Sequence, residues 1–319
     1  MKNFEYAKAR SVDGAIQLST SESRFLGGGI DLLGEMKEYI VSPKRVIDLK
    51  TIPNLDRIET STDVWKLGAN VRIAEIASND QVRATLPGLA EAAAEVGSPQ
   101  IRNVATLGGN LAQHSRCWYY RHRDLRCLKR GGSTCYARDG ENKYHSLFSG
   151  NPCISPVVSN LAVILAALGG RVIVRRGEQE EVTFSIPDLY SDAWNNPLAH
   201  NSLRPADLIV RVEVPTAKNR STYMQVSEKQ DFDWALVSCA AAGQKTGGQW
   251  TQVAVFLGAV APIPYAVDSP LLERSGLTSD SIALIAEGLA SKATLLAHNG
   301  YKLPIAQTLV RRCLDRITT

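Results

Sequence analysis

The sequence Thr106-Leu107-Gly108-Gly109-Asn110 is a tight glycine turn, and four cysteines follow it in a polar, basic segment that ends at Cys153. Glycine has no Cβ, so such a turn lets backbone N–H groups come close to an anion. Four cysteines on one loop indicate a metal centre. This stretch therefore predicts a phosphate-bearing cofactor beside a cage of thiolates, a combination typical of electron transfer.

A second glycine run lies nearer the N-terminus, where a short strand at 24–26 leads into Gly27-Gly28-Gly29-Ile30-Asp31-Leu32-Leu33 and a helix to about Glu38. Strand, glycine run and helix can bind phosphate because a helix N-terminus presents free N–H groups and partial positive charge. A plain turn is the alternative for this run taken alone. It is neither a P-loop nor a G-x-G-x-x-G fingerprint, because the lysine and the spacing are absent.

The four cysteines, Cys117, Cys127, Cys135 and Cys153, have the spacing C-x9-C-x7-C-x17-C. This is neither a C-x2-C zinc ribbon nor a ferredoxin run. A [4Fe–4S] cluster, a structural zinc ion, and free or paired cysteines in a surface insertion therefore all remain open. We interpret Cys239 and Cys313, which lie on an apolar strand and a helix, as buried thiols.

The cysteines are flanked by basic residues: Arg116, Arg121, Arg123, Arg126, Lys129 and Arg130. A cluster held by four thiolates is negatively charged, so a basic surround would stabilise it and raise its reduction potential. A solvated basic loop is the other interpretation. His114, His122 and His145 are spare candidate ligands that we interpret as polar loop residues.

The composition is that of an ordinary globular protein of two or three domains: 319 residues, 44% hydrophobic and 21% charged. A net charge of +4 gives no reason to expect nucleic acid or a membrane surface as partner. No apolar run approaches the roughly 20 residues that span a bilayer, and the N-terminus lacks the apolar core of a signal peptide. We therefore expect a cytoplasmic protein, without membrane insertion.

The patterns further along the chain predict a mixture of strands and helices. We expect helices at 87–96, 160–168, 279–297 and 304–317, and a loop at 192–205. A composition break near 216–220 predicts a domain boundary. Three strands at 222–226, 235–244 and 250–257 would form a meander, with Gly247-Gly248 as one turn.

These motifs resemble those of the FAD-binding medium subunit of the xanthine dehydrogenase and aldehyde oxidoreductase family of molybdenum hydroxylases, over essentially the whole chain. Members carry A-G-G-T-D-L-L where this chain has residues 27–33. They carry T-x-G-G-N after an I-R-N segment, as at 101–110 here, and S-D-x-A before an alanine-rich helix, where this chain has 159–162.

The cysteine segment narrows this resemblance, because most medium subunits lack it. It looks like the insertion in the corresponding subunits of 4-hydroxybenzoyl-CoA reductase and of periplasmic aldehyde oxidoreductases, which carry an extra [4Fe–4S] cluster. The resemblance thus favours the cluster over zinc, with Cys117, Cys127, Cys135 and Cys153 as ligands.

The resemblance implies an α+β fold in two domains. A two-lobed FAD-binding domain of the PCMH/vanillyl-alcohol-oxidase type would cover 1–216, with lobes at about 1–55 and 56–216 and the iron–sulfur insertion at about 114–154. A C-terminal domain like that of the CO dehydrogenase flavoprotein, a three-stranded antiparallel sheet plus helices, would cover 217–319.

The resemblance also implies a set of FAD-binding residues: Leu26, Gly27, Gly28, Gly29, Ile30, Asp31, Leu32, Leu33, Gln100, Arg102, Thr106, Gly108, Gly109, Asn110, Ser159, Asn160, Ile209 and Gln225. The two glycine loops would hold the pyrophosphate mainly through backbone N–H groups. Asn110 and Gln100 would add side-chain hydrogen bonds, and Ile209 would pack near the flavin.

The chain departs from the family pattern at three places. Asn160 stands where the family has Asp, so a carboxylate contact is lost or replaced by an amide. Gln225 and Lys229 stand where a lysine and an arginine are common. Ile30 replaces a small polar residue. The resemblance therefore implies no family-like contacts to the cofactor at these positions.

By resemblance, the chain would be the FAD- and [4Fe–4S]-containing electron-transfer subunit of a complex that oxidises aldehydes or aromatic N-heterocycles. Electrons from the [2Fe–2S] clusters of a small partner subunit would pass through FAD to an external acceptor. A large molybdenum-cofactor subunit would hold the substrate, so no catalytic residue is expected here. A signal-bearing partner could carry the complex to the periplasm.

Three alternatives to this function remain. The first is the FAD subunit of a ferredoxin-fed aromatic acyl-CoA reductase. The second is a zinc-stapled nucleotide-binding module with no redox role. The third is a non-enzymatic assembly protein for the complex.

Overall fold

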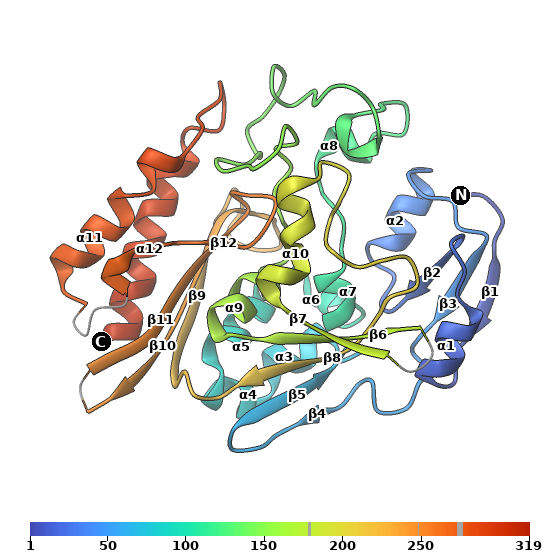
Figure 1. The fold of residues 1–319 in the computed structure, drawn as a ribbon, viewed down its shortest axis with the longest axis horizontal. Helices are drawn as coiled ribbons and strands as arrows, with labels where there is room; N and C mark the ends of the chain where they lie inside the picture. The colour runs from blue at the N-terminus through green and yellow to red at the C-terminus, as the bar shows by residue number, and fades with distance from the viewer. Residues whose placement is uncertain (178–179, 248, 273–276) are drawn as a thin grey trace.

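Three sheets follow one another along the chain in the computed structural model, which describes residues 1–177, 180–247, 249–272 and 277–319 (Figure 1). The first sheet has the order β1-β3-β2 and is parallel throughout, with strands β1 (Glu5–Lys8), β2 (Ser23–Leu26) and β3 (Arg45–Asp48). Parallel neighbours need crossover connections, and α1 (Val12–Leu18) and α2 (Leu32–Lys37) lie in these connections. Ser11 caps α1 by accepting a hydrogen bond from the Gly14 N–H.

The second sheet is antiparallel, with the order β4-β5-β8-β6-β7. Its strands are β4 (Ile58–Glu59), β5 (Val64–Gly68), β6 (Arg171–Arg176), β7 (Glu180–Ser185) and β8 (Leu208–Pro215). Between β5 and β6 lie α3 (Ile73–Ser78), α4 (Asp80–Thr85), α5 (Pro87–Ala94), α6 (Pro99–Arg102), α7 (Leu107–Leu111), α8 (Trp118–Arg121), η1 (Leu128–Arg130) and α9 (Asn160–Leu168). Every residue of α9 is buried, because a helix that is apolar all round belongs inside.

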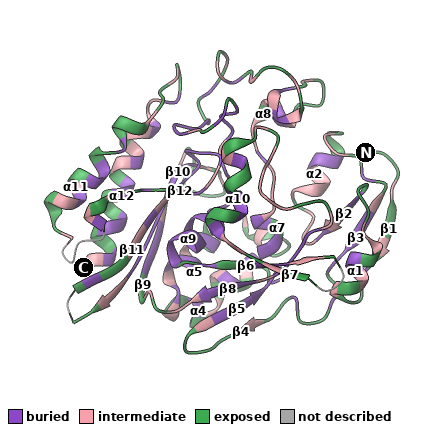
Figure 2. Ribbon diagram, in the orientation of Figure 1, coloured by how far each residue is buried: buried purple, intermediate pink, exposed green. Residues whose placement is uncertain are grey.

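The third sheet is also antiparallel, with the order β12-β11-β10-β9. Its strands are β9 (Arg220–Ser227), β10 (Ala235–Thr246), β11 (Gln249–Gly258) and β12 (Tyr265–Ala266). The helical segments after β12 are η2 (Pro270–Leu272), α11 (Ser279–Glu287), η3 (Ala290–Lys292) and α12 (Lys302–Thr318). Helices α12 and α9 both pack on β10, so most of this strand is apolar and buried (Figure 2).

The predicted helix at 160–168 and the predicted meander are confirmed, with β12 as a fourth short strand. Gly248, in the predicted turn, lies outside the described residues. Two predictions were wrong. The helix predicted at 279–297 ends at Glu287, and the loop predicted at 192–205 begins inside α10 (Ile186–Asn195).

The order of the three sheets follows the predicted lobes and C-terminal domain. However, Tyr223, Ala240 and Ala242 of the third sheet belong to the same hydrophobic core as α9 and the second sheet. The domain boundaries therefore stay a prediction. Across the described ranges, no helix combines the length and the apolar character that crossing a membrane requires.

Candidate functional site

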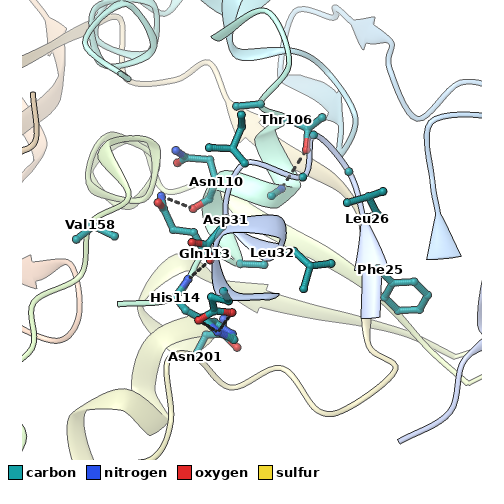
Figure 3. A pocket seen from close by; sticks show the side chains of 18 of the residues that line it. Phe25, Leu26, Asp31, Leu32, Thr106, Asn110, Gln113, His114, Val158 and Asn201 are labelled. Atoms are coloured by element: carbon teal, nitrogen blue, oxygen red, sulfur yellow. Dashed lines mark hydrogen bonds and ion pairs between the residues drawn. The ribbon is translucent and has the colours of Figure 1, made fainter. Parts of the chain in front are cut away.

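A cavity of about 540 Å³ opens between the two glycine loops and the segments 201–207 and 232–234. Eleven of the predicted FAD-binding residues line it: Leu26, Gly27, Gly28, Gly29, Ile30, Asp31, Leu32, Thr106, Gly109, Asn110 and Asn160. Figure 3 shows Leu26, Leu32, Thr106 and Asn110 among the side chains that line it. We call residues 26–32 and 105–110 the glycine cradle.

Glycine is required in the cradle because the two loops cross in contact. A Cβ on Gly28 would lie 2.2 Å from the Val104 carbonyl oxygen, and one on Gly27 would lie 2.7 Å from Thr106 Oγ1. Gly29 has a φ of +79°, a conformation that residues with a side chain rarely adopt. Gly28 is thus required by contact with the backbone of the other loop, Gly27 by contact with the Thr106 side chain, and Gly29 by its positive φ.

The cradle also leaves polar groups free for a ligand. In the ranges that the structure describes, the N–H groups of Gly28, Gly29 and Ile30 donate to no protein acceptor. Ser159 donates to Asn110 Oδ1 at 2.6 Å, which leaves the Nδ2 group of Asn110 to donate elsewhere. Backbone N–H groups and an amide that face one cavity suit an anion such as a pyrophosphate. The residues present therefore fit the cofactor that the sequence predicts.

Seven predicted residues do not line the cavity: Leu33, Gln100, Arg102, Gly108, Ser159, Ile209 and Gln225. Several of them support the residues that do. Leu33 packs against Gly29, and Gly108 packs on Ala69.

Other members of this set lie further from the cavity wall. Arg102 donates to the Val96 and Gly97 carbonyls, so it fixes the turn before α6. Ile209 lies in the core around α9. Gln100 is an exposed residue of α6.

Two of the departures from the family pattern are in contact with each other. Asn160 Nδ2 donates to Gln225 Oε1 at 3.1 Å, and Gln225 in turn donates to Glu95 at 3.1 Å. Glu95 lines the cavity, and burial raises its pKa. A pair of neutral amides thus occupies the place where the family pattern has a carboxylate and an amine.

Asp31 ties the cradle to the segment 114–154, which we call the cysteine insertion. Its carboxylate pairs with Arg116 at 2.9 Å and Arg121 at 2.7 Å, and it accepts the backbone N–H of His114 at 2.8 Å. Sequence reasoning placed Asp31 at the cofactor. In the structure the residue lines the cavity, and its carboxylate is directed at the insertion.

Glu35 lies behind Asp31 and is only 2% exposed. It bonds His114 Nδ1 at 3.1 Å and accepts a hydrogen bond from the Tyr120 hydroxyl at 2.7 Å. Burial raises the pKa of Glu35, but His114 and Arg121 outweigh burial, so this pKa lies below its usual value. Asp31, Glu35 and His114 converge within 4.8 Å. The two guanidinium groups already balance these carboxylates, so we interpret the group as an ion-pair network and not as a cation site.

The structure brings the four predicted metal ligands, Cys117, Cys127, Cys135 and Cys153, to one narrow cavity, the cysteine cavity. All four are free thiols. Burial raises the pKa of Cys117 to about 11. A hydrogen bond from the Cys153 thiol lowers the pKa of Cys135 to about 6 and raises that of Cys153. Four thiolates in so small a space need a positively charged centre to be ionised together.

Lys129 and His145 also line the cysteine cavity. Lys129 is 8% exposed, and its ammonium donates to the Ala199 carbonyl at 2.7 Å. Burial lowers the pKa of Lys129, while all four cysteines act in the opposite direction. His145 is 2% exposed, and its Nε2 lies 3.2 Å from Cys117 Sγ. The basic surround predicted from the sequence thus includes one buried cation.

Lys302, at the start of α12, fastens the insertion to the C-terminal part of the chain. Its fully buried ammonium donates to the carbonyls of Tyr144 at 3.2 Å, His145 at 3.1 Å and Ala259 at 2.6 Å. The backbone N–H of Leu147 also donates to the Val260 carbonyl. The insertion is therefore a packed part of the molecule.

Sequence reasoning did not identify Glu35 or Tyr120 as parts of a site, and it did not single out Lys129 or His145. Lys129 was only one of the six basic residues named as flanking the cysteines, and His145 was a spare candidate ligand that we interpreted as a polar loop residue. One signal was present for Glu35, since it follows Asp31 by four residues and thus shares a helix face with it.

Residues 2–217 match the family described as "FAD binding domain in molybdopterin dehydrogenase". The aldehyde oxidoreductase FAD-binding subunit PaoB of Escherichia coli (strain K12) is 30% identical over 313 residues, 96% of each chain. The carbon monoxide dehydrogenase medium chain of Hydrogenophaga pseudoflava is 24% identical over 98% of this chain and 96% of its own length.

A solved structure of carbon monoxide dehydrogenase from Hydrogenophaga pseudoflava superposes with a TM-score of 0.75 and 23% identity, over 99% of this chain and 97% of the matched one. This confirms the predicted fold class. Since the family match spans residues 2–217 and PaoB aligns over nearly the whole length, this chain belongs to the FAD-binding medium subunits of the molybdenum hydroxylase family, which are components of oxidoreductase complexes.

Proposed function

We propose that this chain carries a [4Fe–4S] cluster as well as FAD and passes electrons between a partner's [2Fe–2S] clusters and an external acceptor. The observation that carries the cluster is the meeting of Cys117, Cys127, Cys135 and Cys153 at one cavity, although up to 36 residues separate them in the chain. The aldehyde oxidoreductase activity in the printed name of PaoB supports aldehydes as one substrate class of the complex.

The resemblance of the cysteine insertion to segments that carry an extra [4Fe–4S] cluster favours a cluster over a single zinc ion. All four thiols reach one cavity, as the ligands of such a cluster must.

When bound, FAD and an iron–sulfur cluster supply the electron chemistry of such a subunit. The chain's own residues bind and orient these groups. The free N–H groups of the glycine cradle and Asn110 Nδ2 would hold the pyrophosphate, with Ser159 fixing the Asn110 amide. The ion pairs of Asp31 with Arg116 and Arg121 hold the cysteine insertion against the cradle. This contact supports electron transfer between FAD and the cluster.

The whole complex would include a large subunit with the molybdenum cofactor and a small [2Fe–2S] subunit. The term "medium chain" in the names of several relatives supports such an assembly. Co-purification of the chain from its native host, followed by identification of its partners, tests this part of the proposal.

The deciding experiment is an absorption spectrum with FAD, iron, zinc and acid-labile sulfide analysis on anaerobically purified protein. About four irons and four sulfides per FAD are expected for one [4Fe–4S] cluster. FAD together with zinc, or FAD with no metal, would contradict the proposed cluster but not the proposed binding of FAD. Protein without FAD would contradict the cofactor proposal itself.

A further inference from the structure

Lys129 stands out among the cations of the insertion because it is buried. Within the part of the chain that the structure describes, its ammonium has one protein acceptor, the Ala199 carbonyl at 2.7 Å. The side chain lines the cysteine cavity together with all four thiols. By contrast, Arg123 in the same insertion is 61% exposed and pairs only loosely, at 3.5 Å, with Asp124. Burial strengthens a charge interaction, because no water screens it.

His145, which follows Lys129 in the insertion, lines the same cavity. Its Nε2 lies 3.2 Å from Cys117 Sγ, whereas its buried Nδ1 has no partner among the described residues. When Cys117 is a thiolate ligand it can only accept, so the ring proton lies on Nε2 and is donated to sulfur. Lys302 donates to the His145 carbonyl, and the Asn142 carbonyl accepts the His145 backbone N–H, so the backbone that carries this ring is fixed.

We infer that Lys129 and His145 are positioning residues that set the reduction potential of the group bound by the four cysteines. This inference rests on the proposed cluster. One electron added to that group adds one negative charge and no proton. A buried ammonium and an N–H···S hydrogen bond both stabilise added negative charge, so both favour the reduced form. Neither residue is a ligand or touches substrate.

The experiment measures the reduction potential of the cluster in the anaerobic holoprotein, by electron paramagnetic resonance at a series of potentials set with dithionite and mediators. Lys129→Gln keeps an amide donor for Ala199 but removes the charge. His145→Phe keeps a ring but removes the donor to sulfur. For each variant we expect the ratio of reduced to oxidised cluster at a fixed potential to fall about tenfold, which equals about 59 mV for one electron.

Matched controls come from the same insertion. Arg123→Gln removes an equal charge at an exposed position, and His122→Phe makes the same ring change at an exposed histidine. Both are expected to change the ratio less than twofold. The flavin potential, read from visible absorption in the same samples, should stay the same in all four variants.

The outcomes separate this inference from the proposed function. If the wild-type protein contains no iron and no sulfide, both the proposed cluster and this inference are wrong. Full iron content in Lys129→Gln and His145→Phe with a wild-type potential overturns the inference and leaves the cluster. If Lys129→Gln fails to load iron, the deciding variant is Lys129→Arg. Wild-type iron content and potential in Lys129→Arg would support a role of the charge. Loss of iron in this variant too would mean that Lys129 acts only through packing.

Discussion

The glycine cradle is built from backbone, whereas the cysteine cavity is built from side chains. In the cradle, Gly27 and Gly28 allow two loops to cross, and the groups left free are N–H groups. In the cavity, four sulfurs from separate turns meet around Lys129 and His145. A substitution in the cradle should therefore act through steric clash. A substitution in the cysteine cavity should act by changing the charge or the number of metal ligands.

The largest effect is expected from Gly28→Val, which tests the cradle. Its Cβ would lie 2.2 Å from the Val104 carbonyl, so the two loops must separate. We expect FAD affinity to fall at least about 100-fold and the free energy of unfolding to drop by about 3 kcal/mol. Gly34→Ala is the control, because a Cβ there meets nothing within 4 Å and alanine favours α2 by about 1 kcal/mol. FAD titration measures the affinity, and urea unfolding measures the free energy of unfolding.

Cys127→Ser tests the cavity. Loss of one thiolate should leave less than about one iron per protein, while FAD stays bound, because the cradle contains none of the four cysteines. Cys239→Ser, at a buried thiol of β10 far from this cavity in sequence, should keep the iron. Equal iron content in the two variants would contradict the ligand assignment. Full electron transfer to every acceptor in Cys127→Ser would show that the cluster lies off the route.

Asp31→Asn tests the contact between the two regions. It leaves the largely buried Arg116 and Arg121 without their shared carboxylate, so unfolding free energy should fall by about 2 kcal/mol. Glu22→Gln, which breaks an exposed pair with Lys44, should cost less than about 0.5 kcal/mol. A larger effect from Glu22→Gln than from Asp31→Asn in urea unfolding would contradict the anchoring role.

The smallest effect concerns Glu35 and pH. Its pKa is lowered in the folded protein, so its stabilising contribution is present above the unfolded-state value of about 4.3 and is lost as pH falls through the lowered folded value. Stability should therefore decline on acidification below about pH 4.3, and Glu35→Gln should decline less steeply. If the free energy of unfolding in urea depends on pH equally in the wild type and in Glu35→Gln between pH 5 and 3, this role of Glu35 is excluded.

The cradle was predictable from the sequence because its requirement is local. Crossing loops exclude a Cβ, and that exclusion leaves a run of glycines. The helix α9 was predictable for a similar reason, since its uniform apolar character demands burial. The helix α10 was missed although Ser185 accepts the Asp188 N–H and Pro187 lies in the first turn, which are helix-start signals.

The environment of the charged residues was not predictable, because it depends on partners far along the chain. Asp31 and Arg121 are 90 residues apart, and Lys129 and Ala199 are 70 apart. Asn160 and Gln225 looked like two separate departures from the family pattern, yet they are one contact across 65 residues. A single sequence shows which residues are charged or polar, and only the fold shows which of them are buried together.

The three carbonyls around Lys302 have a consequence for how the protein is made. Tyr144 and His145 leave the ribosome long before Lys302, which follows His145 by 157 residues. Until α12 packs, the turn that carries His145 lacks the ammonium that holds two of its carbonyls. We therefore expect the cysteine cavity to reach its final shape only after synthesis of α12 has begun, so that stable loading of a metal group follows translation of nearly the whole described chain.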